Sequence, residues 1–148
     1  MQNDAAAHCL PNIPMVFPKA LAIGKRILVV EDNTFVREIT SEILERAGCY
    51  VLKARNAASA KSASEYRQIQ LLITDVVLPG QNGCQLADDL RKTNPGMKVI
   101  LMSGYPGNAI AGKITENNEI AFLPKPFSAE ALLRAVGRML DNSGLVVV

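Results

Sequence analysis

The sequence predicts an α/β protein in which helices cover both faces of a parallel β-sheet. Two observations carry this prediction. The strand-like segments are continuous apolar runs, which are typical of strands buried on both faces. These segments alternate along the chain with segments of helical periodicity, as in successive βαβ units. In such a doubly wound sheet the crossovers are right-handed, and ligands bind beyond the carboxyl ends of the strands.

The first strand and helix have clear signals. Residues 27–30 form a short run of apolar, mostly β-branched residues, which predicts a strand. Asn33 is a typical helix cap, and the following helix is expected to end at Gly48. Its apolar positions recur at helical spacing: Val36, Ile39, Ile43, Leu44 and Ala47.

The next elements follow the same order. A second strand is expected over residues 50–54, and the Ala/Ser-rich residues 57–68 predict a weakly amphipathic, mostly exposed helix. The apolar run at residues 71–74 predicts a third strand that ends at Asp75. After turns at 78–80 and at Asn82-Gly83, a helix with three inward residues ends near 94–96: Leu86, Ala87 and Leu90.

Two further strand–helix pairs complete the pattern. Residues 99–102 predict a buried strand and residues 107–117 a less regular helix. Residues 120–123 predict the last strand, and Ser128 is positioned to cap a final helix. That helix has an apolar stripe made of Leu132, Leu133, Val136, Met139 and Leu140.

Composition indicates one folded domain. A chain of 148 residues suffices for a single core, which we expect over residues 25–141, with an N-terminal tail or linker at 1–24 and a C-terminal tail at 142–148. The net charge of +2 without a dense basic run argues against nucleic acid as a partner. Three widely spaced cysteines predict a reduced, cytoplasmic, zinc-free protein, and no segment predicts membrane insertion or export.

Reactive side chains follow four of the predicted strands. They are Glu31 and Asp32, Asp75, Ser103, and Lys125. Each has an ordinary interpretation as a turn, a cap or a solvated charge. Together they place three carboxylates, a hydroxyl and an ammonium group at the sheet edge where ligands bind. Crowded carboxylates favour a divalent cation such as Mg²⁺, and the lysine and serine can hold phosphoryl oxygens while a carboxylate attacks phosphorus.

Four motifs in this order resemble the receiver domain of bacterial two-component response regulators, over about residues 25–141. They are Ile27-Leu28-Val29-Val30-Glu31-Asp32-Asn33, Thr74-Asp75-Val76-Val77-Leu78-Pro79-Gly80, Met102-Ser103-Gly104-Tyr105 and Phe122-Leu123-Pro124-Lys125-Pro126-Phe127-Ser128. The resemblance implies a flavodoxin-like (βα)5 fold with strand order 2-1-3-4-5. It also implies a phosphoprotein of a phosphorelay that is not a turnover enzyme.

The resemblance also implies individual roles. Asp75 would be the phosphoacceptor and Lys125 would pair with the phosphoryl group, with a cis bond to Pro126. Asp32 would bind Mg²⁺ directly, Glu31 through water, and Val77 through its carbonyl. The switch would consist of Ser103 and Phe122.

The implied partners are a sensor histidine kinase or histidine phosphotransfer protein, and a downstream protein that binds the face formed by the fourth helix, fifth strand and fifth helix. That face includes residues 110–118, Arg134 and Arg138. The chain is then either a stand-alone regulator or a receiver from a hybrid histidine kinase, and homodimerisation stays open.

Two residues at the expected site depart from those that position the hydrolytic water in many receivers. Val77 and Tyr105 are bulky and non-acidic, which leads to the hypothesis that the acylphosphate is lost slowly.

Other functions share the fold or the nucleophile. A flavin or nucleotide binder would need amide-rich phosphate loops where this chain has Glu31-Asp32, and a dinucleotide-binding enzyme would need a Gly-x-Gly-x-x-Gly loop after the first strand. An aspartyl-phosphate phosphatase usually has a second acid where Val77 stands. The main alternative is a pseudo-receiver, an interaction module that phosphorylation does not regulate.

Overall fold

The computed structural model describes residues 23–104 and 119–140. Five parallel strands form one sheet in the order β2-β1-β3-β4-β5. The strands are β1 (Arg26–Val30), β2 (Tyr50–Ala54), β3 (Leu71–Asp75), β4 (Lys98–Ser103) and β5 (Ile120–Pro124). The predicted parallel sheet and its strand order are confirmed.

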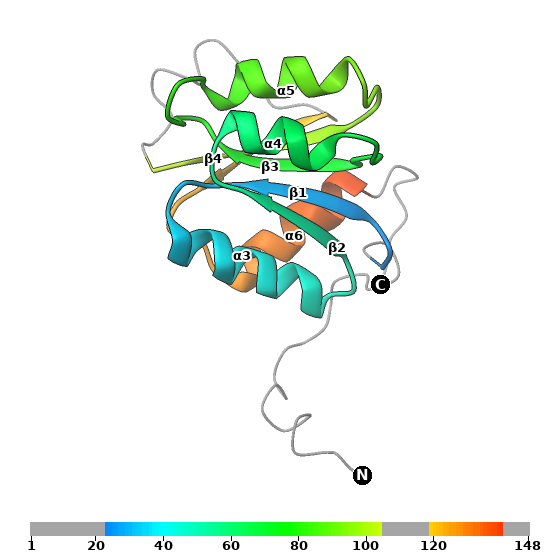
Figure 1. Ribbon diagram of the computed structural model, residues 1–148. Coiled ribbons are helices and arrows are strands. Elements are labelled where there is room, and N and C mark those ends of the chain that lie inside the picture. Colours follow the sequence, from blue (N-terminus) through cyan, green and yellow to red (C-terminus); the bar gives the residue numbers. More distant parts are fainter. Residues whose placement is uncertain (1–22, 105–118, 141–148) are drawn as a thin grey trace.

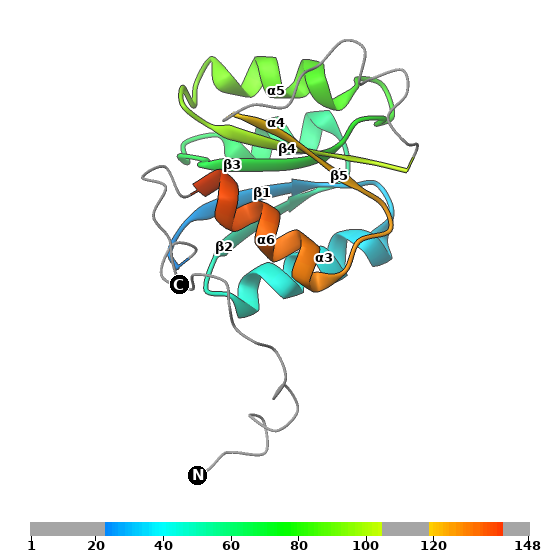
Figure 2. The ribbon, with the colours of Figure 1, turned by 180° about the vertical axis from the view of Figure 1, so that it is seen from behind.

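Helices pack on both faces of this sheet. They are α3 (Thr34–Arg46), α4 (Ala57–Ser64), α5 (Gly83–Arg91) and α6 (Ala129–Leu140). The helices α4 and α5 lie on one face and α3 and α6 on the other, as the two opposite views show (Figures 1 and 2). The helix predicted over residues 107–117, the tail up to residue 22 and the tail at 142–148 lie outside the described residues. Among the helices described, none is long and apolar enough to span a membrane.

Two hydrophobic clusters, one on each face of the sheet, explain why the strands appear as continuous apolar runs in the sequence. Successive side chains of a strand point to opposite faces of a sheet. Accordingly, Ile27 and Val29 belong to the cluster beneath α3 and α6, whereas Leu28 and Val30 belong to the cluster beneath α4 and α5. Because both faces are covered, residues 27–30 of β1 and 71–73 of β3 are all apolar and fully buried.

The predicted helix caps are confirmed, whereas one predicted helix end is wrong. The Asn33 side chain accepts a hydrogen bond from the Val36 N–H at 2.9 Å, and the Ser128 hydroxyl accepts one from the Ala131 N–H at 3.0 Å. The helix predicted over 57–68 ends at Ser64. The next residue is extended and Tyr66 has a φ of +65°, a left-handed conformation that cannot continue a right-handed helix.

Residues 57–68 are mostly exposed, as predicted, whereas α3 buries a more polar face than predicted. In α4 the inward positions are the small residues Ala57, Ala60 and Ser64. In α3, Ile39 is 40% exposed, whereas Thr40 and Ser41 are buried. The Ser41 hydroxyl donates to a main-chain carbonyl of its own helix, which allows burial of this polar group.

Candidate functional site

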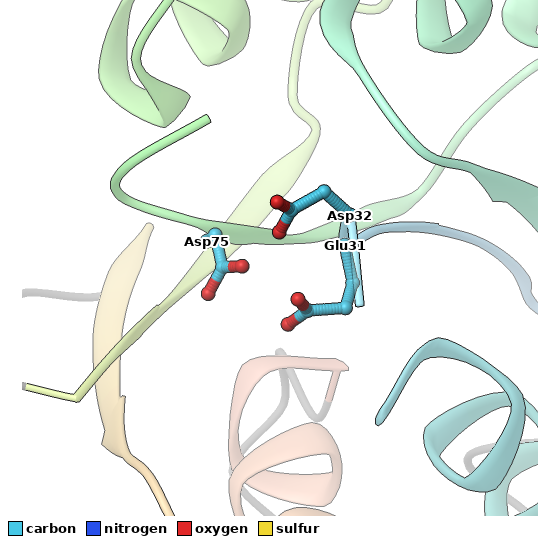
Figure 3. Close-up of side chains that lie close together, drawn as sticks. All are labelled: Glu31, Asp32 and Asp75. Carbon is cyan, nitrogen blue, oxygen red and sulfur yellow. The ribbon is translucent and has the colours of Figure 1, made fainter. Parts of the chain in front are cut away.

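Three carboxylates meet at the carboxyl edge of the sheet. Glu31 and Asp32 follow β1, and Asp75 is the last residue of β3. Because β1 and β3 are adjacent parallel strands, residues distant in sequence come together at their ends. One carboxylate oxygen from each residue lies within 4.8 Å of the others. Figure 3 shows the three carboxylates facing a common space.

Lys125 follows β5 and its ammonium group lies between two of these acids. The Nζ atom is 2.8 Å from Glu31 Oε1 and 2.7 Å from Asp75 Oδ1. Burial alone would lower the pKa of Lys125, but hydrogen bonds to Asp75 and Glu31 outweigh burial and raise it. The Lys125 N–H donates to the Ser103 carbonyl at 2.8 Å, and the bond to Pro126 is cis. The convergence predicted for Glu31, Asp32, Asp75 and Lys125 is therefore present.

The pKa values of the two buried carboxyl groups, Glu31 and Asp75, are shifted in opposite directions. Burial, followed by the hydrogen bond and charge of Glu31, raises the pKa of Asp75 to about 7 against the opposing effect of Lys125. Burial would also raise the pKa of Glu31, but hydrogen bonds from Lys125, the Asn33 N–H and Asp75 outweigh it and lower the pKa. In the metal-free protein near neutral pH, Glu31 is thus ionised while Asp75 retains a proton for part of the time.

Glu31 and Asp32 differ in how available their oxygens are. Glu31 is 1% exposed, with Oε1 bound by Lys125 and Oε2 by the Asn33 N–H at 2.9 Å. Asp32 is exposed, and its carboxylate has no hydrogen-bond or ion-pair partner among the described residues. The oxygens of Asp32 are therefore the ones free to bind a cation directly.

The donor set fits a hard divalent cation. All three side chains offer oxygen, and a single ammonium group cannot neutralise three carboxylates. Burial is the main cause of the raised pKa of Asp75, and the hydrogen bond and charge of Glu31 add to it. Mg²⁺ prefers such oxygen ligands and retains several waters, whereas the soft Cys and His ligands that favour zinc are absent from this cluster of described residues. Asp32 and Asp75, with Glu31 behind them, would hold the ion.

The remaining predicted residues lie around this cluster or outside the described ranges. Ser103 is the last residue of β4, where it is partly exposed and pairs in register with Pro124. Phe122 is half-buried in β5. Val77 lies two residues beyond Asp75 and is 71% exposed. Tyr105 is outside the described residues. The roles assigned to these residues remain predictions.

Gly83 supports the acidic cluster, and sequence reasoning treated it only as part of a turn. It is the first residue of α5, and its N–H donates to the Val76 carbonyl at 2.8 Å. A Cβ atom at this position would lie 2.1 Å from the carbonyl oxygen of Asp75. The absent side chain therefore lets α5 approach the strand end that carries Asp75. The capping box of Asn82 with Gln85 was the available signal for a helix start here.

Comparisons with known proteins agree on one family. The family model of the response regulator receiver domain matches residues 27–137. The chain is 35% identical over 118 residues to the sensor kinase CckA of Brucella abortus, covering 78% of this chain and 12% of that protein. It is 31% identical over 116 residues to the response regulator receiver protein CpdR of the same organism, covering 78% of this chain and 97% of that protein.

A solved structure has the same fold. The CheY-like response regulator receiver domain protein of Methanospirillum hungatei matches with a TM-score of 0.72 at 32% identity. The match covers 80% of this chain and 95% of that one. The chain thus spans nearly the whole of CpdR and of this structure, but only a small part of CckA.

Proposed function

We propose that this chain, which belongs to the response regulator receiver family, accepts a phosphoryl group on Asp75 in the presence of Mg²⁺. One observation carries the proposal: Asp75 lies within a cluster of three carboxylates while its Oδ1 is 2.7 Å from the Lys125 ammonium. The cluster supplies ligands for a cation, and the ammonium group supplies a second positive charge beside the acceptor oxygen.

The reaction is a phosphoryl transfer from a phosphohistidine or a small acyl phosphate. A carboxylate oxygen of Asp75 forms a bond to phosphorus as the bond to the donor's leaving group breaks, and that leaving group departs with the electron pair, a carboxylate leaving as the anion and a histidine as the neutral, protonated imidazole. When bound, Mg²⁺ would neutralise charge between the carboxylates and the phosphoryl oxygens. It would also favour the ionised, nucleophilic form of Asp75, whose pKa of about 7 leaves it partly protonated in the metal-free protein.

Lys125 has a second task after transfer. Its ammonium group contacts Asp75 and Glu31 before the reaction. Once Asp75 is phosphorylated, its ion pair with Lys125 weakens, and the ammonium group can move to a phosphoryl oxygen while it keeps its contact with Glu31. Because the Lys125 N–H is bound to the Ser103 carbonyl, the strand ends of β4 and β5 would respond together.

The output is a change in protein binding. Ser103 and the half-buried Phe122 are the proposed switch, and the proposed partner face comprises the fourth helix of the fold, β5 and α6, where Arg134 and Arg138 are exposed. Residues 110–118, which the resemblance assigns to this face, lie outside the described residues. The relatives include both a sensor kinase and a receiver protein of similar length to this chain, which supports either a stand-alone regulator or a receiver of a larger kinase.

Intact mass after incubation with acetyl phosphate tests the proposal. The wild type should gain one phosphoryl group in the presence of Mg²⁺ and none in the presence of EDTA. Asp75→Asn should gain none, whereas Asp88→Asn, which changes an exposed carboxylate on α5, should behave as the wild type. If neither acetyl phosphate nor a phosphorylated histidine phosphotransfer domain modifies the wild type, the pseudo-receiver alternative replaces this proposal.

A further inference from the structure

The turn between β1 and α3 carries two of the three clustered carboxylates, yet they are held in different ways. The Glu31 side chain is fixed by Lys125 and by the Asn33 N–H. The Asp32 carboxylate has no such partner within residues 23–104 and 119–140. The position of Asp32 therefore depends on the conformation of the main chain on which it stands.

The main chain at this turn is anchored by a side chain from α3. The Glu31 N–H donates to the Ala54 carbonyl of β2 at 3.0 Å, which ends the pairing of the strand. The Glu31 carbonyl accepts a hydrogen bond of 2.9 Å from the Arg37 guanidinium. This carbonyl belongs to the planar peptide unit that joins Glu31 to Asp32, so fixing it restricts the rotation that would swing Asp32 out of the cluster.

Arg37 is well placed to hold that carbonyl. Its side chain is only 16% exposed although it is charged, and its Nε atom lies 3.8 Å from Glu38, which in turn pairs with Lys53 at 2.9 Å. The contact with Glu38 is long and Glu38 is half exposed, so this ion pair contributes little to stability. The bond to the Glu31 carbonyl is the short contact of the guanidinium group.

We infer that Arg37 is a positioning residue for the cation site, because it fixes the peptide unit that presents Asp32. This inference rests on the proposed Mg²⁺ site, since it assigns to Arg37 a role in forming it. The residue acts through the main chain and does not touch the cation or the phosphoryl group.

The sign of the effect on metal affinity separates this role from simple electrostatics. A guanidinium group near a cation site repels the cation, so removing its charge would tighten binding if charge alone mattered. Loss of a group that orders the ligand turn would weaken binding instead. Residues that orient metal ligands typically contribute tenfold or more to affinity.

The experiment measures the affinity of the purified protein for Mn²⁺ from the EPR signal of the free ion, and for Mg²⁺ by competition. The variants are Arg37→Met, which keeps a similar stem without charge or donors, and Arg37→Lys, which keeps the charge and a donor. Arg46→Met on the same helix is the matched control, because Arg46 is 65% exposed and pairs only with Glu42 among the described residues. Thermal unfolding in EDTA is recorded for each variant.

We expect Arg37→Met to weaken Mn²⁺ and Mg²⁺ binding about tenfold, Arg37→Lys to recover part of the loss, and Arg46→Met to match the wild type. Unchanged or tighter binding by folded Arg37→Met overturns the inference. If Arg37→Met does not fold, the decision rests on Arg37→Gln, whose side chain is too short to reach the Glu31 carbonyl in the same way: a folded Gln variant with wild-type affinity overturns the inference, and weaker binding supports it. A wild type that binds neither ion contradicts the proposed function itself, which is a distinct outcome.

Discussion

At the amino end of the sheet, Asn94 is 3% exposed and its side chain is satisfied by neutral partners. It accepts a hydrogen bond from the Ile69 N–H at 2.8 Å and donates to the Leu90 carbonyl at 3.1 Å. At the carboxyl end, Glu31 and Asp75 are buried just as deeply, but they are like charges that share the ammonium group of Lys125.

The difference indicates that the amino end of the sheet stabilises the fold, whereas the carboxyl end carries the reactive groups of the candidate site. A neutral, fully bonded amide stabilises the folded chain, and its loss removes the hydrogen-bond partner of the Ile69 N–H. The raised pKa of Asp75 means that this buried carboxyl group destabilises the metal-free fold near neutral pH, whereas Glu31, whose pKa is lowered, does not. The carboxyl end thus retains an electrostatic penalty that a bound cation can relieve.

The largest expected effect is that of Gly83→Ala, which should destabilise the fold and disturb the carboxyl end of the sheet at the same time. In Gly83→Ala the new Cβ would meet the Asp75 carbonyl oxygen, so α5 or the strand end must shift. We expect a loss of about 3 kcal/mol or more in the free energy of unfolding, together with weaker Mg²⁺ binding. Urea unfolding and metal titration measure the two quantities.

Gly104→Ala is the control for this steric effect. Gly104 follows β4 at the same edge of the sheet, and a Cβ atom there would have no neighbour within 4 Å among the described residues. This variant should keep the stability of the wild type to within about 1 kcal/mol. Equal destabilisation by both substitutions would contradict the importance of the close approach at Gly83.

A substitution at the amino end should affect stability alone. Asn94→Ala removes the acceptor for the Ile69 N–H and the donor to the Leu90 carbonyl. We expect a loss of about 2–3 kcal/mol in the free energy of unfolding. The folded protein should still take up a phosphoryl group in the mass measurement. If Asn94→Ala removed phosphoryl uptake from folded protein, the two ends of the sheet would not be separable as described.

Asp75→Asn should have the opposite effect on stability. The folded pKa of Asp75, about 7, lies above the usual value of 3.8, so the folded state binds more protons than the unfolded state between these two values. Asp75 therefore costs the wild type stability as pH rises from about 4 to 7. We expect Asp75→Asn in EDTA to be more stable than the wild type at pH 8, by on the order of 2 kcal/mol.

The pH dependence tests the cause of this gain. The stability advantage of Asp75→Asn should shrink as pH falls from 8 and largely disappear near pH 4, where Asp75 is protonated in both folded and unfolded chains. Thermal unfolding at a series of pH values measures it. A gain that did not vary with pH would point to packing instead of charge.

The smallest expected effect concerns the lifetime of the acylphosphate. Val77 is 71% exposed beside Asp75 and offers no group that can orient a water molecule. We expect the phosphoryl group to be lost several-fold faster in Val77→Asn combined with Tyr105→Glu, about 1 kcal/mol in the hydrolysis barrier. The decay of the phosphorylated mass with time measures the lifetimes. A lifetime in the wild type no longer than in the double variant would refute the hypothesis of slow dephosphorylation.

Much of the fold could be predicted because its strands are buried on both faces. The continuous apolar runs at residues 27–30 and 71–74 predicted strands of a covered parallel sheet, and Asn33 and Ser128 were correctly predicted as helix caps. The end of α4 could not be predicted, because Ser64 and Glu65 carry no strong helix-breaking signal and the left-handed conformation of Tyr66 depends on the chain's path toward β3.

The candidate site was predicted only in part. The acids Glu31, Asp32 and Asp75 and the cation Lys125 stand at strand ends, where sequence order alone indicates a common edge. The contributions of Arg37 and Gly83 were not predicted. One acts through a main-chain carbonyl and the other through an absent side chain, and neither leaves a chemical signature in the sequence.

The sequence by itself determined the architecture and the reactive residues, because hydrophobic periodicity and strand-end chemistry are local properties. Only the tertiary structure decided how these residues differ from one another. Glu31 lies buried between two donors, Asp32 is exposed, and Asp75 has a raised pKa, although all three are simple carboxylates in the sequence. Burial and neighbouring charge, which arise when distant strands meet, set these differences.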